Sequence, residues 1–444
     1  MVRDRPTPTR APVAGPSVAE AARPRAGRLI AIIALVVIAM RVDIPGNMTA
    51  GAVLSIVMIP LWWSTLKRYR GARSLLVFGG VALLSGAWLT ELSRSTNPVS
   101  VSLMISISVL VGGALCSVGV VLWSRQFLTD AQVALAYGAG LLLGVSPNSA
   151  LFAENPWKFG FAVPVTVIML ALAQMIGGRI VEGVVVLGLT VASAFSDARS
   201  SFAILMFTAL LVFWQMRPRR ASRRASALRV VAGLCALGAI VYTFGQSLIL
   251  DGVLGEQTRQ RSLEQIDTSG SLLLGGRPEL AATLALLQRH PWGYGSGTIP
   301  NLGDVTTAKT GMAAIAYEPD NGYVENYMFG GRFELHSLFG DFWAFFGIPG
   351  IVLVVVLAVV LVRGLSERVA HNTAGAVLIY VAIRTLWNVP FGPVYSSVPL
   401  LILAVGLALL PADDRRRLPG MGRTPAIGVR PPPSGEHPPN VRKN

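Results

Sequence analysis

The fold class of this chain is indicated most clearly by the stretch RFELHSLFGDFWAFFGIPGIVLVVVLAVVLV, residues 332–362. Its last 21 residues contain no charged side chain. A helix needs about 20 predominantly apolar residues to cross the hydrocarbon core of a bilayer. The stretch therefore predicts a membrane-spanning helix that directly follows a polar segment containing Arg332, Glu334 and His336.

The same kind of apolar run recurs along the whole chain. Of the 444 residues, 52% are hydrophobic and only 14% are charged, and the mean hydropathy is +0.57. A soluble domain would carry about 25% charged residues. The sequence predicts an all-α polytopic membrane protein with about twelve spans. We expect their centres near Val36, Ile56, Ala82, Leu110, Leu141, Thr166, Leu187, Thr208, Leu237, Val354, Tyr380 and Leu403.

The basic residues predict the orientation of these spans. Cytoplasmic loops carry an excess of Lys and Arg, and an N-terminus placed inside puts most of the 38 basic residues on the cytoplasmic side. Both termini are therefore expected in the cytoplasm, as disordered Pro- and Arg-rich tails over 1–28 and 411–444. Spans one to nine occupy 29–250, an extracytoplasmic loop occupies 251–335, and spans ten to twelve occupy 336–410.

The net charge of +15 does not predict nucleic-acid binding. Such binding needs basic residues gathered on one face or domain, whereas here they are spread over short loops and both tails. Cys116 and Cys235 both lie in apolar runs, where a free thiol behaves as a small hydrophobe. We expect no disulfide and no thiolate metal site.

The extracytoplasmic loop contains a predicted short helix, in the segment GGRPELAATLALLQRHPWGYGSG, residues 275–297. Pro278 suits the first helical position and Pro291 ends the run. Leu280, Leu284 and Leu287 recur at helical spacing and predict an apolar face. The turn after the helix is rich in glycine, but it lacks the GxGxxG spacing and the preceding strand of phosphate-binding loops.

Arg277 precedes this helix, where free backbone N–H groups and the helix dipole favour anions. Arg199 lies at the predicted outer end of the eighth span, and Arg384 is a similar outer residue. These positions make Arg277 and Arg199 candidate phosphate ligands. The alternatives are an exposed Arg beside a surface helix for Arg277, and a headgroup anchor for Arg199.

His336 stands where the loop re-enters the membrane. Imidazole has an unperturbed pKa near neutrality and can accept a proton from a hydroxyl. The alternative is an interfacial polar residue at a helix end. His290, beside Pro291, is expected to cap the short helix.

The order of these motifs resembles the O-antigen ligase and polymerase superfamily, whose members join lipid-linked glycans on the outer face of the bacterial membrane. The resemblance rests on Arg199 within SDARS, on Arg277 followed by a helix and HPWGYGSG, and on His336 before GDFWAFFGIPG. It covers about 181–362. Related sequences often carry Asn directly after this His, whereas this chain has Ser337.

The resemblance implies an integral membrane glycosyltransferase of the inner membrane with a GT-C-like bundle. Arg199 and Arg277 would bind the diphosphate of a polyprenyl diphosphate-linked glycan donor, and His336 would activate the acceptor hydroxyl. Arg332, Glu334 and Arg384 are supporting candidates. The acceptor is a glycan, a lipid or a protein, so ligase and polymerase activities both remain open, and membrane lipids are the other expected partners.

The chemistry is consistent with these residues. Guanidinium groups bind phosphate bidentately and stay charged, so two Arg residues can replace a metal ion. No Asp-x-Asp motif occurs, and we expect a reaction without metal or cofactor. A single base implies attack opposite the leaving group and hence inversion of the anomeric carbon.

Two alternatives remain from the sequence. A transporter or flippase of lipid-linked sugars would also have about twelve spans, but neither an internal repeat nor a charged midplane site is evident. A peptidoglycan-type polymerase would use a loop carboxylate, for which Glu279 is the candidate. The aromatic residues Phe342, Trp343 and Phe346 either pack in the core or line a groove for the polyprenyl chain beside the spans near Thr208 and Val354.

Overall fold

The computed structural model describes residues 18–44, 48–196, 198–216, 256–269 and 277–412, with isolated positions between 232 and 250. Most of these residues form helices. In the N-terminal part the helices are α1 (Val18–Met40), α2 (Ala50–Val57), α3 (Ile59–Trp62), a 3₁₀ helix (Trp63–Arg68), α4 (Ala72–Ser93), α5 (Val101–Ser124), α6 (Asp130–Leu143), α7 (Ala150–Glu154), a π-helical turn (Trp157–Phe161), α8 (Ala162–Ile176), α9 (Arg179–Phe195) and α10 (Arg199–Trp214).

The C-terminal part continues with α12 (Glu256–Ser269), α14 (Glu279–Arg289), α15 (Leu302–Ala313), a π-helical turn (Val324–Met328), α16 (Leu338–Ala370), α17 (Ala376–Phe391) and α18 (Val394–Ala408). Within the described ranges the one sheet is a two-stranded antiparallel pair. In it β1 (Asp43–Ile44) lies beside β2 (Met48–Thr49), with Asp43 opposite Thr49.

Among the described residues, four helices are long and apolar enough to cross a membrane: α4, α5, the helix over Trp157–Ile176, and α16. The bent pair Ala50–Val57 and Ile59–Arg68, with an angle of 55° between its halves, would make a fifth. Several other apolar helices, including α6, α10, α17 and α18, are shorter than a bilayer-spanning helix. The prediction of a mainly helical membrane protein is confirmed. The count of twelve spans stays a prediction, and the ninth, near Leu237, lies mostly outside the described residues.

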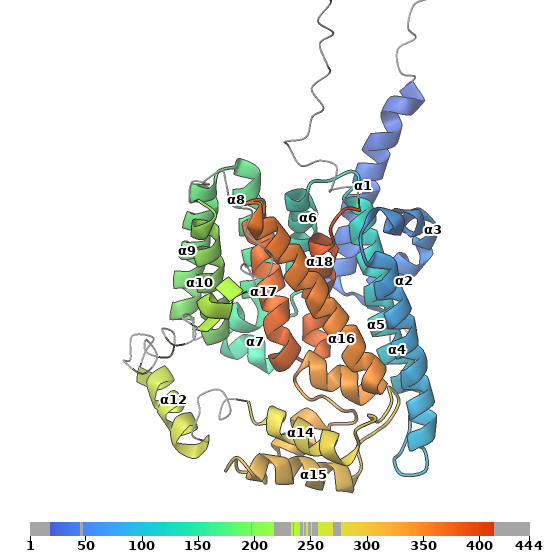
Figure 1. Ribbon diagram of the computed structural model, residues 1–444, viewed down its shortest axis with the longest axis vertical. Coiled ribbons are helices and arrows are strands. Elements are labelled where there is room, and N and C mark those ends of the chain that lie inside the picture. The colour runs from blue at the N-terminus through green and yellow to red at the C-terminus, as the bar shows by residue number, and fades with distance from the viewer. Residues whose placement is uncertain are drawn as a thin grey trace, which may run out of the picture.

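The long helices run side by side as a bundle, and α12, α14 and α15 lie at one end of it (Figure 1). Helix α16 packs on α4, α17 and α18, and α18 also packs on α5. We call residues 277–335 the cap. Helices α14 and α15 pack on each other within it.

The cap helix α14 forms where the sequence predicts it. On the predicted apolar face Leu280 and Leu287 are half-buried and Leu284 is 60% exposed, whereas Ala282 and Leu286 are fully buried. Whether this face lies on the membrane stays a prediction. Helix α15 approaches α14 at Ala281 and Ala285, where a Cβ on Gly311 would meet the Ala281 carbonyl and the Ala285 side chain.

The glycine-rich turn after α14 inserts between α4 and α16. Tyr294 and Gly295 donate their backbone N–H groups to the carbonyl of Ala344 on α16, and Ser296 donates to the carbonyl of Gly86 on α4. Gly295 has a φ of +108°, and a Cβ atom there would meet the backbone of α4. The N–H groups of this turn are used inside the protein, so the turn fixes the cap to the bundle.

The aromatic residues at the start of α16 belong to the core. Phe342, Trp343 and Phe346 are at most 2% exposed. The expectation that they line an open groove for a polyprenyl chain is therefore not met. The alternative, ordinary packing, holds, because the turn 292–297 and α4 cover these rings.

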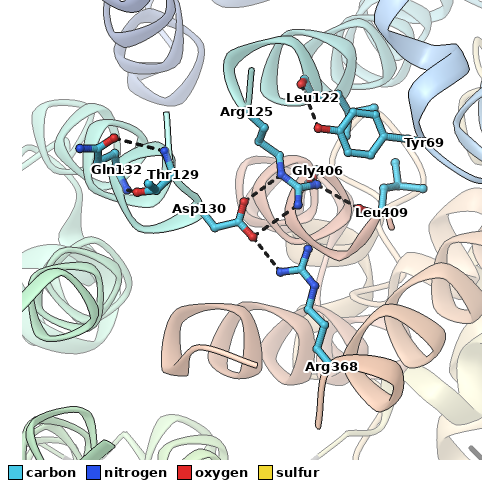
Figure 2. Close-up of polar contacts among 9 residues, drawn as sticks. All are labelled: Tyr69, Leu122, Arg125, Thr129, Asp130, Gln132, Arg368, Gly406 and Leu409. Carbon is cyan, nitrogen blue, oxygen red and sulfur yellow. Dashed lines mark hydrogen bonds and ion pairs between the residues drawn. The ribbon is translucent and has the colours of Figure 1, made fainter. Parts of the chain in front are cut away.

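An ion-pair cluster joins several helices at the end of the bundle away from the cap (Figure 2). Asp130, at the start of α6, accepts from Arg125 at 2.9 Å and from Arg368 of α16 at 2.7 Å. Arg125 also donates to the carbonyls of Gly406 and Leu409 at the end of α18, both at 2.9 Å. Arg125 and Arg368, which belong to two basic segments predicted to be cytoplasmic, therefore meet at one end of the bundle. Which side of the membrane this end faces stays a prediction.

Candidate functional site

The candidate site surrounds His336, where the cap joins α16. His336 has a φ of +53°, in the left-handed region that residues other than glycine rarely adopt. Both neighbours are held in place. Leu335 donates its N–H to Asp341 at 2.6 Å, and the Ser337 hydroxyl accepts from the N–H of Gly340 at 2.8 Å and caps α16. The surrounding hydrogen bonds thus maintain an unusual backbone conformation at this histidine.

Asp341 links this turn to a second helix. Its other carboxylate oxygen accepts from the N–H of Val394, at the start of α18, at 2.8 Å, and the residue is fully buried. A buried carboxylate is tolerated where its oxygens are hydrogen-bonded. Asp341 therefore fixes the His336 turn against the start of α18.

The hydrogen bond of the His336 ring determines which nitrogen is free. Nδ1 lies 3.1 Å from the carbonyl oxygen of Glu334. A carbonyl can only accept, so Nδ1 carries the proton and Nε2 keeps its lone pair. The half-buried ring therefore has an acceptor nitrogen that this hydrogen bond does not use.

Tyr323 and Glu279 complete this side of the site. The Tyr323 ring lies 6.2 Å from the His336 ring, and its hydroxyl donates to Glu279 at 2.5 Å. Burial, together with the Glu279 charge, raises the pKa of Tyr323 well above its usual range, so Tyr323 remains a neutral donor. The second Glu279 oxygen is buried and has no hydrogen-bond partner among the described residues.

Arg277 acts electrostatically on the same tyrosine. Its positive charge opposes the rise of the Tyr323 pKa, and its guanidinium lies 5.7 Å from the ring centre of Phe391 at the end of α17. Tyr323 is thus influenced by the charge of Arg277 and lies near the ring of His336, although the two residues are far apart in the sequence.

Arg332 and Glu334 form an ion pair at 2.8 Å instead of standing free. The Arg332 guanidinium also lies 4.0 Å from the ring centre of Tyr395, on α18. Glu334 contacts His336 through its backbone carbonyl, while its side chain binds Arg332. Both residues therefore support the His336 turn.

Arg199 and Arg384 form a second group. Arg384, on α17, donates to the Ser201 hydroxyl at 3.0 Å. Arg199, two residues before Ser201 at the start of α10, donates to Ser262 of α12 at 2.9 Å. This group and the Arg277 group both touch α17. Arg384 and Phe391 are seven residues apart on that helix, about 10 Å along its axis. The structure thus places the candidate cations in two groups along one helix.

Sequence reasoning missed Tyr323 and Asp341. Tyr323 stands in a polar loop without a recognisable motif. Asp341 had a signal, because an ionisable residue at the start of a long apolar helix is by default a functional candidate. In the part of the chain that the structure describes, no three His, Cys, Asp or Glu side chains gather as metal ligands.

The comparison with protein families finds one match. Residues 183–355 match the family model described as O-antigen ligase. The matched segment begins in α9, ends in α16, and contains Arg199, Arg277 and His336 but not Arg384. A search of curated proteins finds no match. The predicted resemblance is confirmed over residues 183–355, the part of the chain that matches the O-antigen ligase family model.

Proposed function

We propose that this protein is an inverting, metal-independent glycosyltransferase that moves a glycan from a polyprenyl diphosphate donor to an acceptor hydroxyl. The reaction would take place on the outer face of the bacterial inner membrane. The observation that carries the proposal is the arrangement of Arg277, Glu279 and His336 around Tyr323, within a segment of the O-antigen ligase family.

In the proposed reaction the acceptor oxygen attacks the anomeric carbon as the bond to the diphosphate breaks. Nε2 of His336 takes the hydroxyl proton, since Nδ1 is held by the Glu334 carbonyl. Arg277 binds the departing diphosphate, whose negative charge grows in the transition state. Arg199 and Arg384 would bind the donor further along α17.

The buried carboxylate of Glu279 supplies a second candidate base. Its unpartnered oxygen lies in the same cluster as His336. A loop carboxylate as base is the arrangement expected of a peptidoglycan-type polymerase, so this observation keeps that activity as the second candidate. Glu279→Gln, which keeps the shape and removes the charge, separates the two bases.

The test uses the purified full chain in detergent with a polyprenyl diphosphate oligosaccharide. We expect wild type to release polyprenyl diphosphate, and Arg277→Ala and His336→Ala to lose at least about 100-fold of that rate. Arg94→Ala is the matched control, because Arg94 is exposed and pairs only with Glu91. A strong loss in Glu279→Gln with retained activity in His336→Ala would move the base to Glu279.

Two further outcomes would overturn the proposal. Retention of the anomeric configuration in the product, measured by NMR, would exclude single-step transfer. Binding of the lipid-linked glycan without cleavage, for every acceptor class offered, would favour a transporter.

A further inference from the structure

A cavity of about 420 Å³ lies where α1, α2, α5 and α18 meet, beside the candidate site. Its apolar wall includes Ile38 of α1, Leu110 and Ala114 of α5, and Ile402 of α18. Ser106 and Ser117 of α5 both line it, so it extends about 16 Å along that helix. The cavity is long enough for part of a hydrocarbon chain, and Ser106 and Ser117 interrupt its apolar wall.

The charged lining of this cavity comes from one end of it. Arg41 and Asp43 follow the end of α1, Thr49 precedes α2, and Tyr395 is at the start of α18. These positions lie at the end of the bundle that carries the cap, because α16 and α18 both begin there (Figure 1). The cavity is thus amphipathic along its length, with its polar end where lipid headgroups of that leaflet would lie.

Arg41 and Asp43 supply opposite charges side by side. Arg41 donates to the carbonyl of Tyr395 at 2.6 Å, and the Asp43 charge acts on it directly. Arg41 thus reaches the start of α18 through Nη1. A purely anionic headgroup would be attracted by Arg41 and repelled by Asp43, whereas a headgroup with a phosphate next to an amine matches both charges.

We propose that this cavity binds a phospholipid with a phosphoethanolamine headgroup, a site separate from the Arg277 and His336 cluster. Arg41 binds the phosphate, Asp43 binds the ammonium group, and an acyl chain lies along α5 and α18. Tyr395 lines the cavity and its backbone carbonyl accepts from Arg41.

The cavity adjoins the candidate site through Tyr395. The Arg332 guanidinium lies 4.0 Å from the ring centre of Tyr395, and Arg332 also forms an ion pair with Glu334. The backbone carbonyl of Glu334 in turn accepts from the His336 ring. A bound lipid would therefore contact Tyr395, on whose ring Arg332 packs. The binding proposal itself does not require glycosyl transfer, and its test reads binding alone.

The test measures binding of short-chain lipids to the delipidated full chain in detergent, by native mass spectrometry. The probes are phosphatidylethanolamine, phosphatidylglycerol with the same chains, the matching diacylglycerol, and glycerophosphoethanolamine without chains. We expect phosphatidylethanolamine to bind at least about 10-fold more tightly than each of the others, because only it satisfies both charges and the apolar wall.

Variants separate the two charges. Arg41→Gln should weaken phosphatidylethanolamine binding at least about 10-fold. Asp43→Asn should abolish the preference over phosphatidylglycerol, because the ammonium group loses its partner. Ala114→Leu, which fills the apolar part, should weaken binding of every probe that has chains, and Arg94→Gln is the control that should change nothing.

Three results would overturn the proposal. Equal binding of diacylglycerol would mean that no headgroup is recognised. Equal or tighter binding of phosphatidylglycerol would indicate an anion site. Unchanged phosphatidylethanolamine binding in folded Arg41→Gln would remove Arg41 from the site. The thermal unfolding midpoint shows whether each variant is folded. If Arg41→Gln unfolds, Asp43→Asn tests the site instead.

Discussion

Among single residues, Asp341 shows how this chain holds the His336 turn in place. His336 has a left-handed backbone, and the N–H group just before it is fixed by Asp341, which also holds the start of α18. A carboxylate accepts from both N–H groups because both of its oxygens are acceptors. The geometry of His336 thus depends on a charged residue that does not touch it through its side chain.

Replacing Asp341 by Asn should separate folding from activity. An amide has one acceptor oxygen, so either Leu335 or Val394 would lose its partner, and a buried unsatisfied N–H costs about 1–3 kcal/mol. We expect the transfer rate to fall at least about 10-fold as the His336 turn shifts. The measurement is release of polyprenyl diphosphate. Asp320→Asn, at an exposed carboxylate paired with Lys309, is the control, and an unchanged rate in Asp341→Asn would contradict the positioning role.

At the scale of elements, the glycine-rich turn over 292–297 acts as a connector. Its N–H groups donate to carbonyls of α4 and α16, and Ser93 of α4 donates to the carbonyl of Tyr294. The Tyr294 ring stacks on Phe333 of the cap, with ring centres 4.2 Å apart. The turn therefore sets how the cap, which carries Arg277 and Glu279, sits on the helix that begins beside His336.

Gly295→Ala tests this connection. The residue has a φ of +108°, and its Cβ would meet the backbone of Leu89 and Thr90, so we expect destabilisation by more than about 1 kcal/mol and loss of transfer activity. Gly80→Ala on α4 is the matched control, because a Cβ there meets open space and alanine favours a helix. The thermal unfolding midpoint of each variant in detergent gives the answer. Equal midpoints for the two variants would mean that the turn adapts.

At the scale of the whole molecule, the Asp130 cluster ties the end of the bundle away from the cap (Figure 2). Asp130→Asn should destabilise the protein by about 3 kcal/mol, because Arg125, whose side chain is 7% exposed, loses its charge partner. Glu91→Gln removes an exposed pair and should change stability by less than about 1 kcal/mol. Chemical denaturation in detergent measures both. A smaller loss for Asp130→Asn than for Glu91→Gln would show that the carbonyls of α18 suffice for Arg125.

The orientation of the molecule can be tested by cysteine labelling. Leu302, on α15 in the cap, is 84% exposed, and Lys67 lies at the end of the bundle away from the cap. With Cys116 and Cys235 changed to Ala, Leu302→Cys should react with an impermeant maleimide in intact spheroplasts, because the cap is predicted outside. Lys67→Cys should react only after permeabilisation. The reverse pattern would place the candidate site in the cytoplasm and exclude the proposed reaction.

A mainly helical membrane protein and a helix after Arg277 could be predicted from the sequence, and His336 and Arg277 remain candidate site residues. Hydropathy, proline positions and charge bias are local properties, so they can be read along the chain. Which face of α14 is covered could not be predicted, because it depends on neighbours that are distant in the sequence.

The contacts between side chains from distant segments are visible only in the tertiary structure. Tyr323 and Glu279 are 44 residues apart, and Asp341 and Val394 are 53 apart. The cavity at Arg41 needs four helices from both ends of the chain. Such contacts follow from how helices pack, and helix packing depends on side-chain shape across segments that the local pattern does not connect.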